Sequence, residues 1–136
     1  MFKKEVTYVD FNGTERTETL YFHMSVPEAS RLEAKLGGKT IEEYAKSLEA
    51  DQDIEKSLAF VELMILSSYG KKSENGKAFL KTKDIVEEFE YSQAYAELFE
   101  EIILSPATAQ QFAQGIGTKP TTVKAPRPTV LPTGDR

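Results

Sequence analysis

The sequence has 136 residues, with 17 basic and 22 acidic side chains and no cysteine. This length suits one domain, and the lack of thiols excludes disulfides, thiolate metal sites and cysteine nucleophiles. The opening residues MFKKEV lack the apolar run of a signal peptide. No stretch approaches the roughly 18 apolar residues of a membrane span, so no membrane partner is expected.

The charge is unevenly distributed. The last 21 residues carry four basic side chains against Asp135 alone, which leaves residues 1–115 with 13 basic and 21 acidic side chains, a net charge of −8. An acidic body repels phosphate backbones, so nucleic acid is not expected as a partner either. The same acidic excess is also typical of an ordinary solvated surface.

Residues 2–24 alternate as a β-hairpin does, with the apolar pairs Val6/Tyr8 and Leu20/Phe22 on its two arms. A two-residue loop at the Asn-Gly pair would place these pairs on opposite faces, because a one-residue change of register exchanges the faces of a strand. A three-residue loop, with a type I turn at residues 10–13 and Gly13 left-handed, places all four on one face. We therefore predict the three-residue loop.

Two capping-box sequences, Ser25 with Glu28 and Thr40 with Glu43, predict two short helices, the first ending at Gly37-Gly38. Their expected inward side chains are Val26, Ala29, Leu32 and Leu36, then Ile41, Tyr44, Ala45 and Leu48. Residues 54–69, apolar on most sides, predict a buried core helix capped by Asp51 or Asp53. The alternative interpretation of that apolar surplus is a groove for a partner helix.

Residues 69–78 are polar and predict a mobile turn. Their glycines and lysines resemble a phosphate-binding loop only superficially, since no Ser or Thr follows Lys77 and no strand is expected before the loop.

Residues 79–103 predict two short amphipathic helices with a break near Tyr91–Ser92, where Ser92 caps the second helix and Thr82 could cap the first. One continuous helix is the weaker alternative. The apolar face holds Ile85 and Phe89, then Tyr95, Leu98, Phe99, Ile102 and Ile103. Ser105-Pro106 begins a last helix with Ala109, Phe112 and Ala113 inward, which Gly115 or Gly117 ends.

From Thr118 the composition changes to proline and threonine with few apolar side chains, which predicts a disordered tail. The expected organisation is therefore a domain at 1–117 and a flexible tail at 118–136. The expected fold class is α+β, mainly α, with an N-terminal β-hairpin followed by about five or six short helices.

No catalytic or cofactor site can be assembled from these residues. His23 is the sole histidine, so we expect a structural role for it. Adjacent glutamates on helices point in different directions, and the start of a calcium loop at Asp51-Gln52-Asp53 lacks the glycine that its turn needs. We expect a non-enzymatic protein with no metal and no cofactor.

One set of packing and turn residues carries a resemblance. It comprises Ser68-Tyr69-Gly70, Asn75-Gly76, Phe79-Leu80-Lys81, Glu88-Phe89, Ser92, Ala94-Tyr95, Leu98-Phe99-Glu100-Glu101 and Pro106. With these residues the chain resembles the tail assembly chaperones of long-tailed phages and prophages, and the resemblance covers residues 3 to 115.

The resemblance implies a protein of the host cytoplasm that coats the largely helical tape-measure protein, keeps it soluble while tail tube subunits polymerise around it, and is absent from the mature virion. It implies the tape-measure and tail tube proteins as partners, with possible self-association in several copies. A longer frameshifted form is common in the family. Glu97, Glu100 and Glu101, on the polar side of their helix, are the candidate partner-binding residues. The competing hypothesis is a structural virion component, such as a tail or head-completion protein.

Overall fold

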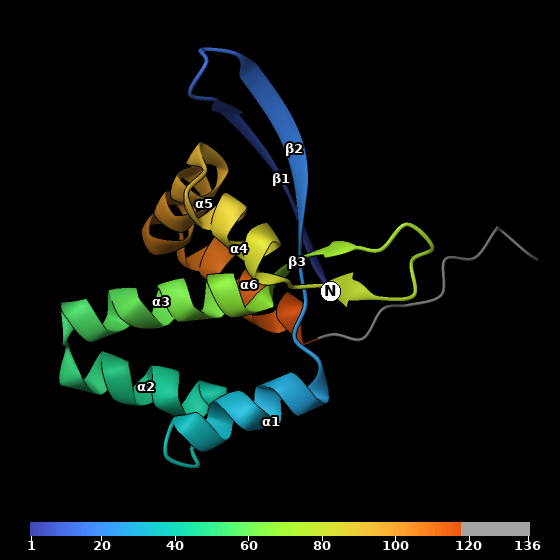
Figure 1. The fold of residues 1–136 in the computed structure, drawn as a ribbon. Helices are drawn as coiled ribbons and strands as arrows, with labels where there is room; N and C mark the ends of the chain where they lie inside the picture. The colour runs from blue at the N-terminus through green and yellow to red at the C-terminus, as the bar shows by residue number, and fades with distance from the viewer. Residues whose placement is uncertain (118–136) are drawn as a thin grey trace, which may run out of the picture.

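A computed structural model describes residues 1–117 (Figure 1). Its elements in chain order are β1 (Phe2–Val9), β2 (Glu15–Phe22), α1 (Val26–Lys35), α2 (Ile41–Asp51), α3 (Ile54–Ser68), β3 (Tyr69–Lys72), β4 (Phe79–Leu80), α4 (Lys83–Glu90), α5 (Gln93–Leu104) and α6 (Pro106–Ile116). This confirms the expected fold class of an N-terminal hairpin followed by helices. The predicted tail at 118–136 lies outside the described residues.

The β1–β2 hairpin has the predicted three-residue loop. Lys4 pairs with Leu20 and Tyr8 with Arg16, and the amide of Asp10 donates to the carbonyl of Thr14 over 2.8 Å. Gly13 has a φ of +82° and its amide donates to the Asp10 carbonyl, which closes the turn. This register puts the four predicted apolar side chains on one buried face.

Replacing Gly13 with valine is expected to lower the free energy of unfolding by about 1–2 kcal/mol, because a β-branched residue is strained at positive φ. A Cβ at this position would meet no atom within 4 Å, so the cost comes from the backbone alone. Urea denaturation measures it. Gly13→Asn is the control, since asparagine tolerates the left-handed region, and equal losses for both variants would contradict the explanation.

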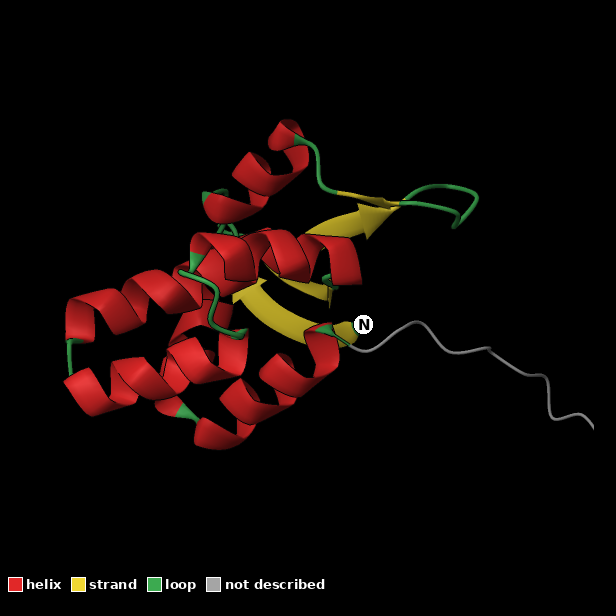
Figure 2. Cartoon of the chain, turned by 90° about the horizontal axis from the view of Figure 1, so that it is seen from below, coloured by secondary structure: helices red, strands yellow, loops and turns green. Residues whose placement is uncertain are grey.

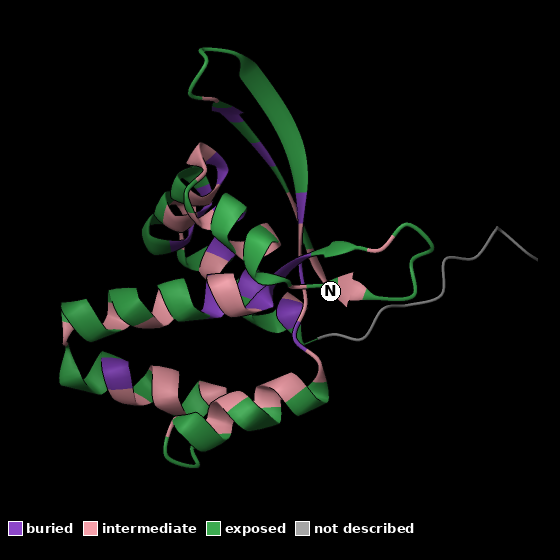
Figure 3. Cartoon of the chain, in the orientation of Figure 1, coloured by how far each residue is buried: buried purple, intermediate pink, exposed green. Residues whose placement is uncertain are grey.

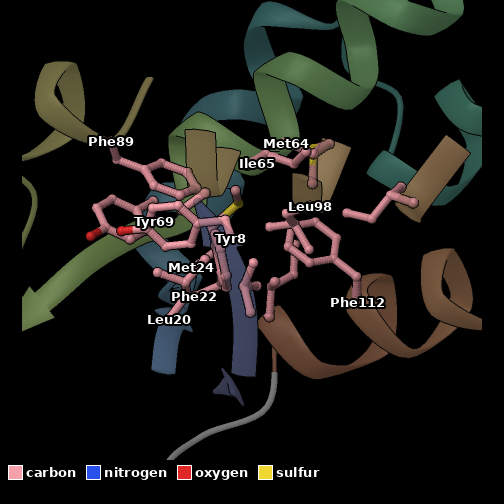
Figure 4. Close-up of a cluster of buried hydrophobic side chains, with 14 residues drawn as sticks. Tyr8, Leu20, Phe22, Met24, Met64, Ile65, Tyr69, Phe89, Leu98 and Phe112 are labelled. Carbon is pink, nitrogen blue, oxygen red and sulfur yellow. The ribbon is translucent and has the colours of Figure 1, made fainter. Parts of the chain in front are cut away.

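The aromatic core is centred on Phe22, which is completely buried. Its ring contacts those of Tyr69, Phe89 and Phe112 (Figure 4) and that of Phe2, at centroid distances of 5.4–6.1 Å. Tyr69 and Phe89 stack at 3.9 Å with their planes 12° apart, and burial raises the pKa of Tyr69 to about 12. The core therefore joins both hairpins to α4 and α6 through side chains from distant parts of the sequence.

The first strand and the last helix pack tightly together. The rings of Phe2 and Phe112 lie 5.5 Å apart, and a Cβ placed on Gly115 would come within 2.9 Å of the Phe2 Cβ. Met24 also donates its amide to the Ile116 carbonyl over 2.8 Å. Only a glycine fits the α6 backbone this closely to β1.

Residues 69–80 correct the prediction of a polar turn. Here β3 pairs with the end of β2, Tyr21 opposite Gly70, and then with β4, Lys71 opposite Leu80, so the sheet order is β1-β2-β3-β4. The turn itself closes through side chains, with Ser73 and Asn75 accepting backbone amides. The lysines of β3 concealed this strand, because pairing with β2 rather than an apolar pattern holds it in the sheet.

Helix α3 is less buried than predicted. Asp53 caps it as expected, but only Met64, Ile65 and Ser68 near its end are buried, while Ile54 is 74% exposed. The first half of α3 projects past the sheet and packs on α2 (Figures 1 and 3). The apolar side chains of α3 therefore lie partly in the core, near the end of the helix, and partly in the half that packs on α2.

The caps of the other helices follow the prediction with one exception. Both capping boxes form, and Ser92 accepts the Tyr95 amide, so α4 and α5 are separate helices rather than one. Thr82 occupies the N-cap position of α4 without a side-chain capping bond. Among the side chains predicted to face inward, Val26 is 67% exposed and Ile103 is 46% exposed. Gly117 is the C-cap of α6.

Candidate functional site

Helices α1 and α2 form an arm beside α3 (Figures 1 and 2). An apolar groove lies between this arm with α3 on one side and helices α5 and α6 on the other. Its volume is about 490 Å³. The arm and α3 contribute Ala29, Ile41, Ala45, Phe60, Val61 and Met64, while the opposite wall is Ile102 of α5 with Ala109, Phe112, Ala113 and Ile116 of α6. Met24 and Gly117 also line the groove, together with two exposed polar side chains, Glu42 and Gln114.

The arm covers this groove without filling it. Helix α1 has no buried residue and α2 has only Leu48 (Figure 3). Leu32 and Ile41 lie against the core cluster but stay partly exposed. Such a weakly packed pair of helices belongs to the less stable part of a domain and can move relative to the core.

Two contacts fix the arm at its ends. Tyr44 of α2 contacts the Phe60 ring of α3 at 5.2 Å. At the other end, the Lys81 ammonium donates to Glu28 of α1 over 2.8 Å and to the carbonyls of His23 and Ser67 over 2.6 and 2.8 Å. Lys81 therefore joins the starts of α1 and α4 to the ends of β2 and α3.

The Glu28 carboxyl sits at this junction with two opposing influences on its pKa. Burial alone would raise the pKa, but hydrogen bonds from Lys81 and from the Ser25 amide outweigh it, so the pKa lies below its ordinary value. Glu28 is therefore ionised at neutral pH and completes both the capping box and the ion pair.

The residues predicted from sequence lie elsewhere. Glu97, Glu100 and Glu101 line a separate shallow depression beside β1, with a volume of about 330 Å³. Glu97 and Glu100 are exposed, but Glu101 accepts hydrogen bonds from Lys4 over 2.6 Å and from Thr108 over 3.0 Å. The Lys4 contact is the main reason that the Glu101 pKa is lowered. Glu101 thus links α5 to β1 and α6, which makes it a poor surface probe.

The groove lining was only partly visible in the sequence. Phe60, Val61 and Met64 belong to the apolar surplus of α3 that suggested a groove. The other wall comes largely from α6, where the sequence predicted Ala109 and Ala113 as inward core positions. Ala109 is partly buried, but Ala113 is exposed at the groove. Their contribution depends on how far the arm stands from α6, and no local pattern encodes that distance.

Other kinds of site find no support in the described part of the chain. Within residues 1–117, no three His, Asp or Glu side chains gather where they could bind a metal ion. None of the helices there has the length and apolar character needed to cross a membrane.

Comparison with protein families finds one match, and it covers residues 1–122. The matching family is described as phage tail assembly chaperone. Comparison with curated proteins and with solved structures finds no match.

Proposed function

This chain belongs to a family of phage tail assembly chaperones, and we propose that it binds the tape-measure protein in the groove between its arm and its core. In this proposal the chaperone keeps the tape-measure protein soluble in the host cytoplasm and helps to recruit tail tube subunits. It acts without catalysis and leaves before the virion is complete.

The apolar groove is the observation that supports this proposal. A tape measure that is a long amphipathic rod exposes apolar stripes, which aggregate unless another surface covers them. One stripe of a helix presents side chains at i, i+3, i+4 and i+7, and an apolar groove between helices is the usual receptor for that pattern.

The loosely packed arm supports release as well as binding. An arm held by Tyr44–Phe60 and Lys81–Glu28 can open to admit a helix and close again. The affinity of the groove for that helix is then reduced by the free energy needed to open the arm. A reduced affinity suits a protein that tube subunits must later displace. The acidic body also keeps neighbouring chaperones on one rod apart.

Coexpression with the tape-measure protein of the same phage tests the proposal. The chaperone is expected to raise the soluble fraction of its partner and to co-purify with it in several copies. A partner that stays equally insoluble and never co-purifies would contradict the proposed function. Stoichiometric amounts of this protein in finished particles would favour a structural tail protein instead.

Ala113→Glu tests the groove itself. The substitution places a carboxylate in the apolar lining while glutamate keeps α6 helical, so affinity is expected to fall at least about tenfold. Ala107→Glu, on an exposed position of the same helix outside the groove, is the matched control. Glu97→Lys tests the surface predicted from sequence. Loss of binding with Glu97→Lys and not with Ala113→Glu would move the interface to α5.

A further inference from the structure

The outer half of β2 leaves one backbone edge open. Over its whole length β2 pairs with β1, but β3 pairs with it only at Tyr21 and Phe22 before turning away to β4. Among residues 1–117 no strand continues along the edge from Glu15 to Leu20, where the hairpin rises beyond the helices (Figure 1). An open edge of this kind is a template for another strand.

The register identifies which backbone groups face this edge. In an antiparallel hairpin, hydrogen-bonded pairs alternate with pairs whose N–H and C=O point outward. Asp10 and Thr14 form a hydrogen-bonded pair, so the pairs of even-numbered residues bond to each other within the hairpin. The backbone N–H and C=O groups of Glu15, Thr17 and Thr19 therefore point away from β1, toward the open edge. The bond from the His23 amide to the Ser68 carbonyl, on the same edge, agrees with this alternation.

The side chains along this edge are complementary to themselves in one register. Two antiparallel copies of β2 can bond only with odd residues opposite odd residues. Placing Thr17 opposite Thr17 of the second copy sets each Arg16 opposite a Glu18, which favours pairing. The next allowed registers shift one copy by two residues, which sets Arg16 opposite Arg16 in one direction and Glu18 opposite Glu18 in the other. Like charges directly opposite each other are destabilising.

We propose that the chain forms a two-fold symmetric dimer by pairing the β2 edges about Thr17, which gives a continuous β1-β2-β2-β1 sheet. Arg16 already donates from Nε to Asp10 over 2.6 Å, and the guanidinium has further donors for the opposite Glu18. The inference rests on the hairpin alone and is independent of which tail protein the groove binds. The dimer would place two grooves on one assembly.

Two matched proline variants test the dimer by sedimentation of the full chain. Thr17→Pro removes the outward N–H at the centre of the interface, whereas Thr7→Pro makes the same change on the opposite edge of the same cross-strand pair. Both variants lose the Thr7–Thr17 hydroxyl contact of 3.0 Å, so they perturb the hairpin alike. Thr17→Pro is expected to raise the dimer Kd at least about tenfold, and Thr7→Pro to leave it nearly unchanged.

A charge-reversal pair tests the charge complementarity of the β2 edges even if the prolines disturb folding. Alone, Arg16→Glu and Glu18→Arg each set like charges opposite one another and are expected to be monomeric. Mixed together, the two variants restore every opposite pair and are expected to form a heterodimer. A wild-type chain that stays monomeric up to its solubility limit would overturn the proposal, as would dissociation by Thr7→Pro alone or a mixture that does not associate.

Discussion

Replacing Phe22 with alanine is expected to lower the free energy of unfolding by about 3–5 kcal/mol, the range for truncating a fully buried phenylalanine. The side chain has no exposed surface and contacts four aromatic rings from β1, β3, α4 and α6. Its loss leaves a cavity where these elements meet, and the rings around it cannot collapse without moving two helices. A loss of this size is a large share of a domain's usual stability of about 5–15 kcal/mol.

Denaturant unfolding followed by circular dichroism measures this loss. Phe11→Ala is the matched control, because the same truncation occurs in the same hairpin at a side chain that is 81% exposed. The control is expected to change stability by less than about 0.5 kcal/mol. If Phe22→Ala behaves like Phe11→Ala, Phe22 is not the centre of the core.

Lys81→Met is expected to lower the free energy of unfolding by about 2–3 kcal/mol, because it leaves two backbone carbonyls and a carboxylate without their charged donor. The Lys81 side chain is only 16% exposed, so water replaces the ammonium poorly. Lys83→Met serves as the control, since the Lys83 ammonium is 84% exposed and lies 3.9 Å from Glu87. That exposed pair contributes little. Equal effects of the two substitutions would contradict the role assigned to Lys81.

The effect of Lys81→Met is also expected to depend on pH. The folded-state pKa of Glu28 lies below its ordinary value of 4.5, so its carboxylate contributes stability above that pH. This contribution is lost as the pH falls through the lowered pKa, when the carboxyl takes up a proton. The difference in stability between wild type and Lys81→Met should therefore be largest near neutral pH and shrink below pH 4.5. Unfolding measured across this range tests the sign.

Local signals in the sequence predicted most of the secondary structure. A serine or threonine three residues before a glutamate specifies a helix start by its own hydrogen bonds, so both capping boxes could be recognised without tertiary information. Hairpin register was equally accessible, because only the three-residue loop puts Val6 and Leu20 on one face. These features depend on neighbours a few residues apart.

Features that depend on distant neighbours were missed. Strand β3 exists because β2 and β4 flank it, and Gly70 is required there because a Cβ would lie 2.7 Å from the Leu80 carbonyl oxygen. Two of the residues that carried the family resemblance have structural roles of this kind, Gly70 at a close approach and Lys81 at a junction. They identify the fold, whereas the groove lies between elements and has no motif of its own.

The packing of β1 against α6 constrains when the protein can fold during its synthesis. The ribosome makes Phe2 first, yet Phe112 and the Gly115 backbone that cover it are among the last described residues to emerge. The chain between these residues must close before the contact yields any stability, so this packing forms only after Gly115 has been synthesised. Until then the nascent hairpin carries an uncovered aromatic face, so the chain passes through an aggregation-prone stage before its core is complete.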